Sequence, residues 1–346
     1  MKKAMKSLKI LSCFFGVFSG YQANAKAPLF PSKAKAPLTV TASPSPFPPL
    51  PRRPINNANP HLVAWSNLFF PGAGELIRGN YGEGLTQTAY ESATFMSGYL
   101  LSEKESFSSL DGISDSFKPF NRLSRGERNS QVSLERKMFS NILLEFSIKA
   151  HMTNTFLAYR DAYKAQGVTL GLDQHTEWEA FMSPFEKKYL LDSDVWIPLT
   201  IVAASVIADY ATTQPAAVSA LNPRSNFLYD FNYGIWQPIG SGYPEESFFR
   251  GFLQNEVKLA THSPVMAVLA QSIAFALSHE PGGGRYSAAL VGMYLGYLAE
   301  KKHGDLGPGI AVHFWGDIFL GVETALLSHR EQKTTPQAGF TLQFNY

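Results

Sequence analysis

The sequence predicts an all-α protein: a multi-helix transmembrane bundle that follows a disordered, proline-rich N-terminal tether. Apolar residues in the second half of the chain recur at helical spacing, and short breaks that contain Gly and Pro separate these segments. The run from Leu259 to Ser278 contains no Asp, Glu, Lys or Arg over 20 residues, which is the length needed to cross a bilayer. The periodicity predicts the helices, and the uncharged run predicts the membrane.

Residues 1–25 have the pattern of a secretory signal peptide. Four lysines precede or flank an apolar stretch from Ile10 to Phe18, and Ala23-Asn24-Ala25 is a small-x-small cleavage site. We expect cleavage after Ala25, with an uncleaved N-terminal anchor as the alternative. Cys13, the only cysteine in the sequence, lies in this segment. The mature chain would then lack disulfides, thiolate nucleophiles and cysteine-bound zinc.

Residues 26–60 are dense in proline and have no apolar period, which predicts an extended, disordered tether in the periplasm. The whole chain has a formal net charge of +2, and removing the four lysines of the signal segment leaves a mature charge of 2 − 4, or −2. Binding a polyphosphate requires a basic stripe, and the sequence contains none. Nucleic acid is therefore excluded as a partner.

Residues 61–240 are expected to form an N-terminal helical region. Trp178 to Leu191 interleaves aromatic residues with lysines, as segments at a bilayer edge do. The polar stretch from Glu103 to Glu135 is expected to be a surface loop or an amphipathic segment. The other expected elements are a helical hairpin from His61 to Ser102 broken at Pro71 to Gly74, a helix from Leu134 to about Ala165, and an apolar run from Val195 to Ala208.

Residues 241–328 supply the clearest helical patterns, and residues 329–346 follow them as a tail. Four helices joined by short loops must pack as neighbours, so this region is expected to be a compact helical core. The last eight residues of the tail alternate like a strand, which raises the alternative of an envelope-assembly component. The four expected helices are Tyr243 to about Ala260, Pro264 to Ser278, Tyr286 to Glu300, and Gly309 to Leu327.

The first of these helices carries a Glu-Glu-x-x-x-Arg motif. Glu246 and Arg250 stand at i,i+4 with the acid first, which is the favourable order for a helical ion pair. Glu245 then has no partner on its own helix. Its neighbours are mostly apolar, so its carboxylate would be partly desolvated and is a candidate general base. The alternative is a purely structural ion pair.

Two further motifs carry histidine. His279 ends the most hydrophobic helix, in a Phe-x-x-x-His motif, and His313 shares a helix face with Asp317 at i,i+4. His279 could instead cap its helix, and His313 with Asp317 could be a packing pair. These structural alternatives do not explain why all three motifs lie on three of four consecutive helices.

In this order the three motifs resemble those of the CPBP family, which comprises CAAX-prenyl endoproteases of the Rce1 type, bacteriocin-processing proteins and Abi proteins. The resemblance extends from about Tyr243 to Leu327. It implies an intramembrane endopeptidase in which the first Glu and the second-motif His activate a water, while the third motif stabilises the oxyanion. The implied site residues are Glu245, Glu246, Arg250, His279, His313 and Asp317.

The resemblance also implies a role for each of these residues. Glu245 and His279 would hold the water, and Glu246 with Arg250 would brace the helix. His313 would polarise the scissile carbonyl. Asp317 stands where many members have Asn, and because a charged Asp is a poorer oxyanion donor we expect it to orient His313.

No cofactor is expected, although the family has been described both as metalloproteases and as metal-independent glutamate proteases. Glu245, His279 and His313 would be the ligands if zinc took part. The sequence has no His-Glu-x-x-His helix, and a Glu beside a His in an apolar site can activate water without metal.

The expected partners are the lipid bilayer and a peptide or a membrane or envelope protein substrate. The expected location is the inner membrane of the bacterial cell envelope, with the tether in the periplasm. The alternative function is a catalytically idle membrane scaffold, or an immunity or envelope-assembly protein of the same fold.

Overall fold

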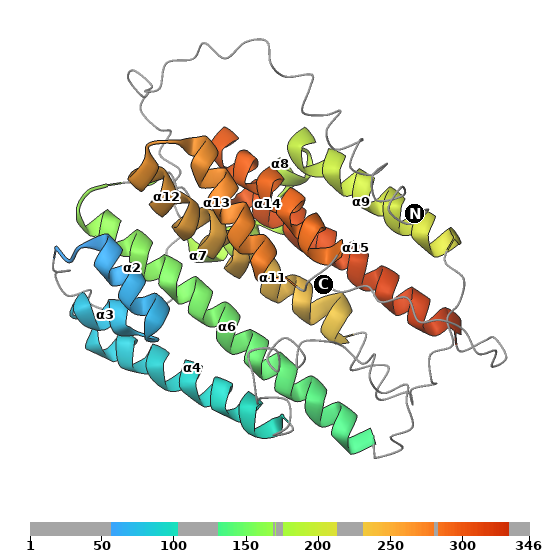
Figure 1. Ribbon diagram of the computed structural model, residues 1–346, viewed down its shortest axis with the longest axis horizontal. Helices are drawn as coiled ribbons and strands as arrows, with labels where there is room; N and C mark the ends of the chain where they lie inside the picture. The colour runs from blue at the N-terminus through green and yellow to red at the C-terminus, as the bar shows by residue number, and fades with distance from the viewer. Residues whose placement is uncertain are drawn as a thin grey trace, which may run out of the picture. The chain divides into compact units, whose positions relative to one another are not determined.

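The structure is a computed structural model, and it describes residues 57–102, 131–168, 170, 176–212, 231–279 and 283–331. Within these residues all regular structure is helical and no strand occurs, which confirms the all-α prediction (Figure 1). The signal segment 1–25, nearly all of the tether 26–60, most of the polar stretch after residue 102 and the tail beyond residue 331 lie outside the described residues.

The predicted hairpin is present as three helices, α2 (Pro60–Phe69), α3 (Ala73–Ile77) and α4 (Tyr81–Leu101). The Asn59 side chain accepts from the first amides of α2, and Pro60 occupies its first turn. Gly72 has a φ of 78°, and a Cβ there would lie 2.0 Å from a backbone oxygen of Gly84. This close approach of the turn to α4 is possible only for glycine.

Helix α6 (Gln131–Ala165) packs against α4 and α2, and it confirms the helix predicted from Leu134 to about Ala165. Short elements follow it: α7 (Glu177–Met182), a 3₁₀ turn (Ser183–Phe185) and α8 (Lys187–Leu190). Helix α9 (Ser193–Thr212) contains the predicted apolar run and packs along α15. Figure 1 shows α4 and α6 side by side.

The C-terminal helices have nearly the predicted bounds, and they contact one another as expected. Helix α11 packs against α15 and α6, and α13 packs against α14 and α12. They are α11 (Gln237–Glu246), α12 (Gln254–Thr261), α13 (Pro264–Leu277), α14 (Gly283–Lys301) and α15 (Gly307–Glu331). A π-helical turn (Ser247–Leu253) joins α11 to α12.

The uncharged run from Leu259 to Ser278 is not one helix, so the argument that it is long enough to span a bilayer was wrong. His262 has a left-handed φ of 52°, and the Ser263 side chain caps the next helix by accepting from the Met266 amide. Pro264 stands at the first helical position, where its missing N–H costs nothing. Helix α13 is therefore only 14 residues long.

One helix in the described part of the chain is long and apolar enough to cross a membrane. It is the stretch Ser193–Ala211 of α9, with 19 residues. The helical bundle is thus confirmed, while the structure supports one candidate span and not a full set of spanning helices.

Aromatic residues from three helices form the core beneath the motif helices. Tyr159 of α6 and Phe252 of the π-helical turn are fully buried and meet edge to face, with ring centroids 5.2 Å apart. Gly251 lets the π-helical turn lie close to α6, because a Cβ there would lie 2.5 Å from the Phe156 ring. Ile310 of α15 belongs to the same cluster. This packing holds three helices against one another: α6, α15 and α11, which carries the two glutamates.

Candidate active site

The paired glutamates lie at the end of α11, directly before the π-helical turn. Glu245 and Glu246 are both buried, and Pro244 before them has no amide hydrogen to donate within the helix. A π-helical turn shifts the faces of the residues on either side of it, and such turns are frequent at functional sites. The sequence predicted this helix from Tyr243 to about Ala260 but not its π-helical segment.

Glu246 forms the centre of a buried charge cluster. Its Oε1 accepts from Arg250 Nη1 at 2.9 Å and lies 2.8 Å from His313 Nδ1. Because a carboxylate only accepts, His313 must carry hydrogen on Nδ1 and donate it to Glu246. The guanidinium of Arg250 also lies over the Phe275 ring, 4.4 Å from its centroid. The expected i,i+4 ion pair is therefore present, and it also holds a histidine of another helix.

Close packing of α15 lets Glu246 fit between two helices. Gly309 lies at this contact, where an added Cβ would be 3.0 Å from Glu246 Oε2. A larger residue at Gly309 would push the carboxylate away from His313.

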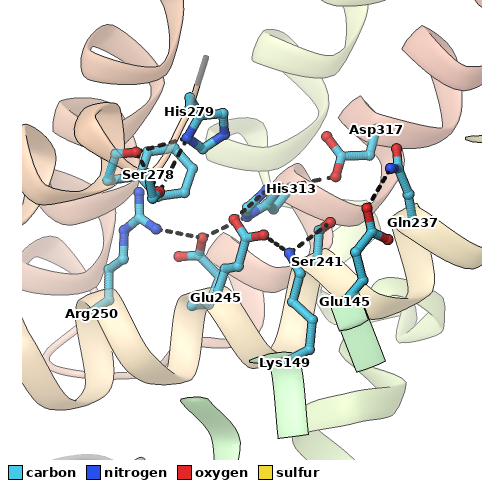
Figure 2. Close-up of polar contacts among 12 residues, drawn as sticks. Glu145, Lys149, Gln237, Ser241, Glu245, Arg250, Ser278, His279, His313 and Asp317 are labelled. Atoms are coloured by element: carbon cyan, nitrogen blue, oxygen red, sulfur yellow. Dashed lines mark hydrogen bonds and ion pairs between the residues drawn. The ribbon is translucent and has the colours of Figure 1, made fainter. Parts of the chain in front are cut away.

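The second nitrogen of His313 faces two carboxylates. Its Nε2 lies 3.7 Å from Glu245 Oε2 and 3.7 Å from Asp317 Oδ2. Figure 2 shows His313 between these two side chains. Both separations are too long for a direct hydrogen bond. Glu246, and not Asp317, therefore makes the short contact that sets the orientation of the imidazole. Asp317 shares the helix face with His313, as predicted, but it approaches the free side of the ring.

Residues 228–319 match the family model described as "Type II CAAX prenyl endopeptidase Rce1-like". This segment is Rce1-like. The match confirms the resemblance to CAAX proteases over this segment, which is less than half of the chain. No curated protein and no solved structure matches the chain.

His279 lies two residues after the end of α13, at the edge of the charge cluster formed by Glu246, Arg250 and His313. Its Nδ1 donates to the carbonyl oxygen of Phe275 at 2.7 Å, which leaves the lone pair on Nε2. The Phe275 ring contacts both imidazoles, with its centroid 4.5 Å from that of His279 and 5.7 Å from that of His313. Arg285 donates twice to the His279 carbonyl oxygen and so fixes the backbone here.

Burial lowers the pKa of His279 to about 4, and the nearby cations Lys149 and Arg250 act in the same direction. At neutral pH the imidazole is therefore uncharged. An uncharged imidazole with its Nε2 lone pair available can accept a hydrogen bond or a proton.

Lys149 of α6 is the member of the cluster that the sequence did not predict. Its ammonium pairs with Glu245 Oε1 and lies 3.4 Å from Ser241 Oγ (Figure 2). Glu245 thus has no partner on its own helix, as expected, but it has one from α6. The available signal was a lysine within the apolar pattern of the predicted helix from Leu134 to about Ala165.

A cavity of about 300 Å³ lies beside this ion pair. Lys149 and Pro244, the residue before Glu245, form part of its wall. Glu145, one helical turn before Lys149, accepts from Gln237 Nε2 at 2.9 Å in the same wall. The rest of the lining is mostly apolar or aromatic, with Phe146, Phe181, Trp236 and Ile239. Such a cavity suits an apolar group better than an ion.

The described residues contain no group of three His, Cys, Asp or Glu side chains that could hold a metal ion. Glu245 Oε2 and His313 Nε2 lie 3.7 Å apart, and His279 and His313 both contact the Phe275 ring.

Proposed function

We propose that the Rce1-like region is the catalytic core of an intramembrane endopeptidase that hydrolyses a peptide bond with an activated water. The observation that carries this proposal is the arrangement of the charge cluster. Glu245, His279 and His313 come from three separate segments, and the cluster around them is mostly buried. Burying ionisable side chains in an apolar setting costs folding free energy, and side chains of this kind inside membrane bundles mark functional sites.

In the proposed reaction Glu245 takes a proton from water, with His279 Nε2 as the second acceptor that orients this water. The resulting hydroxide attacks the scissile carbonyl carbon, and the carbonyl oxygen becomes an oxyanion. His313, whose Nδ1–H is held by Glu246, presents Nε2 toward that oxygen, and a proton on Nε2 would donate to it. The proton held by Glu245 then passes to the amine nitrogen as the oxyanion re-forms the carbonyl, the C–N bond breaks, and a carboxylic acid and a free amine are released.

No metal is required by this scheme, and we propose a metal-free mechanism with a peptide or a membrane or envelope protein as substrate. The proposed location is the inner membrane of the bacterial envelope, with the tether in the periplasm. The family match and the candidate span in α9 support a membrane location.

A second candidate is a catalytically idle scaffold of the same fold, or an immunity or envelope-assembly protein. The ion pair between Lys149 and Glu245 favours it, because an ion pair between two helices can serve packing alone.

Glu245→Gln separates the two candidates. The amide keeps the shape of the side chain but cannot take a proton, so turnover of the native substrate, or the dependent phenotype, should fall by about 10² to 10⁴-fold. His279→Ala should behave in the same way, and a chelator should leave activity intact. Glu300→Gln on α14, outside the cluster, is the control. Full function of Glu245→Gln at normal protein level would support the scaffold, and loss of activity with chelator would support a metal enzyme.

A further inference from the structure

Lys149 enters the charge cluster from a helix outside the Rce1-like segment. It lies in the middle of α6, and its ammonium reaches Glu245 Oε1 and the neighbourhood of Ser241 Oγ on α11. The side chain is only 20% exposed, so this charge is held among protein groups and little screened by water.

Several other charged or titratable groups face or flank Glu245. Arg250 is paired with Glu246, which also accepts from His313, so the charge of Arg250 is matched by Glu246 and not by Glu245. Two further carboxylates lie nearby, Asp317 on α15 and Glu145 on α6, and the uncharged His279 packs against Phe275. The cation that contacts Glu245 directly is Lys149.

We infer that Lys149 is a positioning residue, which keeps Glu245 ionised and aims its free oxygen at the reaction site. This inference rests on the proposed role of Glu245 as the base. Without a cation, a buried carboxylate beside Glu246 and Asp317 is driven toward its neutral form by burial and by like charge. A neutral carboxyl cannot take a proton from water.

The geometry also explains the aim of the carboxylate. Lys149 occupies Oε1, and this leaves Oε2 on the side of His313, where the two atoms are 3.7 Å apart. A water polarised by Glu245 must bind at Oε2 to be near His313, the residue proposed to stabilise the oxyanion. The ammonium thus selects which of the two oxygens is free.

Chemical labelling of Glu245 tests this inference without a substrate. Dicyclohexylcarbodiimide reacts with protonated carboxyls in apolar surroundings, and peptide mass spectrometry of the full-length protein in detergent reports the labelled fraction across a pH series. Glu245→Gln identifies the labelled peptide. Lys258→Met, which removes a lysine paired with Glu300 far from Glu245, is the matched control.

Wild-type Glu245 should stay unlabelled at neutral pH. In Lys149→Met and Lys149→Gln the pH of half-labelling should rise by about one to three units, because an opposite charge at this range has an effect of that size on a carboxyl. Lys149→Arg should restore the wild-type value, and Lys258→Met should leave it unchanged.

Two results would overturn the inference: labelling of wild-type Glu245 at neutral pH, or an unchanged half-labelling pH in a neutral Lys149 variant that unfolds at the same temperature as Lys258→Met. Labelling does not depend on hydrolysis, so it tests Lys149 whatever the activity of Glu245→Gln proves to be.

Discussion

Replacing Glu246 by Gln tests the buried charge cluster most directly. The side chains of Glu246 and Arg250 are 1% and 0% exposed, so the variant leaves a guanidinium without its counter-charge in the interior. Removing one partner of a buried pair typically costs about 3 to 5 kcal/mol. The contact of Arg250 with the Phe275 ring remains and offsets about 0.5 to 2 kcal/mol of a buried cation's cost. The amide oxygen can still accept one hydrogen bond.

We therefore expect Glu246→Gln to lose about 2 to 4 kcal/mol of unfolding free energy. The assay is reversible unfolding in mixed detergent micelles, followed by circular dichroism. Glu300→Gln is the matched control, because its pair with Lys258 is partly exposed and worth about 0 to 1 kcal/mol. If the two variants unfold with the same free energy, the buried Glu246–Arg250 pair stabilises the fold no more than the partly exposed Lys258–Glu300 pair does.

Two further predictions follow from the packing and from α9. Gly251→Ala should cost about 1 to 3 kcal/mol in the same unfolding assay, because the new methyl would lie 2.5 Å from the Phe156 ring. Gly316→Ala, where no atom lies within 4 Å of the new Cβ, should be neutral or slightly stabilising, and an equal loss in both variants would contradict the packing argument. The protein should stay with membranes through high-salt and carbonate washes and leave only with detergent, since Ser193–Ala211 is long enough to span. Release by carbonate would contradict the membrane assignment.

The sequence identified the helices of the Rce1-like region because helical periodicity is a local property. The ends of α13 and α14 agree with the prediction to within a few residues, and the Glu246 to Arg250 pair follows directly from i,i+4 geometry. The prediction that residues 259–278 span the membrane failed because hydropathy averages side-chain polarity and does not detect helix ends. Here the left-handed His262 and the capping Ser263 end one helix and begin the next.

Only the tertiary structure shows which polar side chains pair between helices. His313 is bound to Glu246 at 2.8 Å and is 3.7 Å from Asp317, although Asp317 is its i,i+4 neighbour. Lys149 reaches Glu245 from a helix whose own sequence carries no motif. The sequence by itself thus determined the helices, the order of the motifs and the pair within one helix. The partners of Glu245 and His313 depend on how α6, α11 and α15 pack, because contacts between helices are set by side-chain packing at their interface and leave no fixed spacing in the chain.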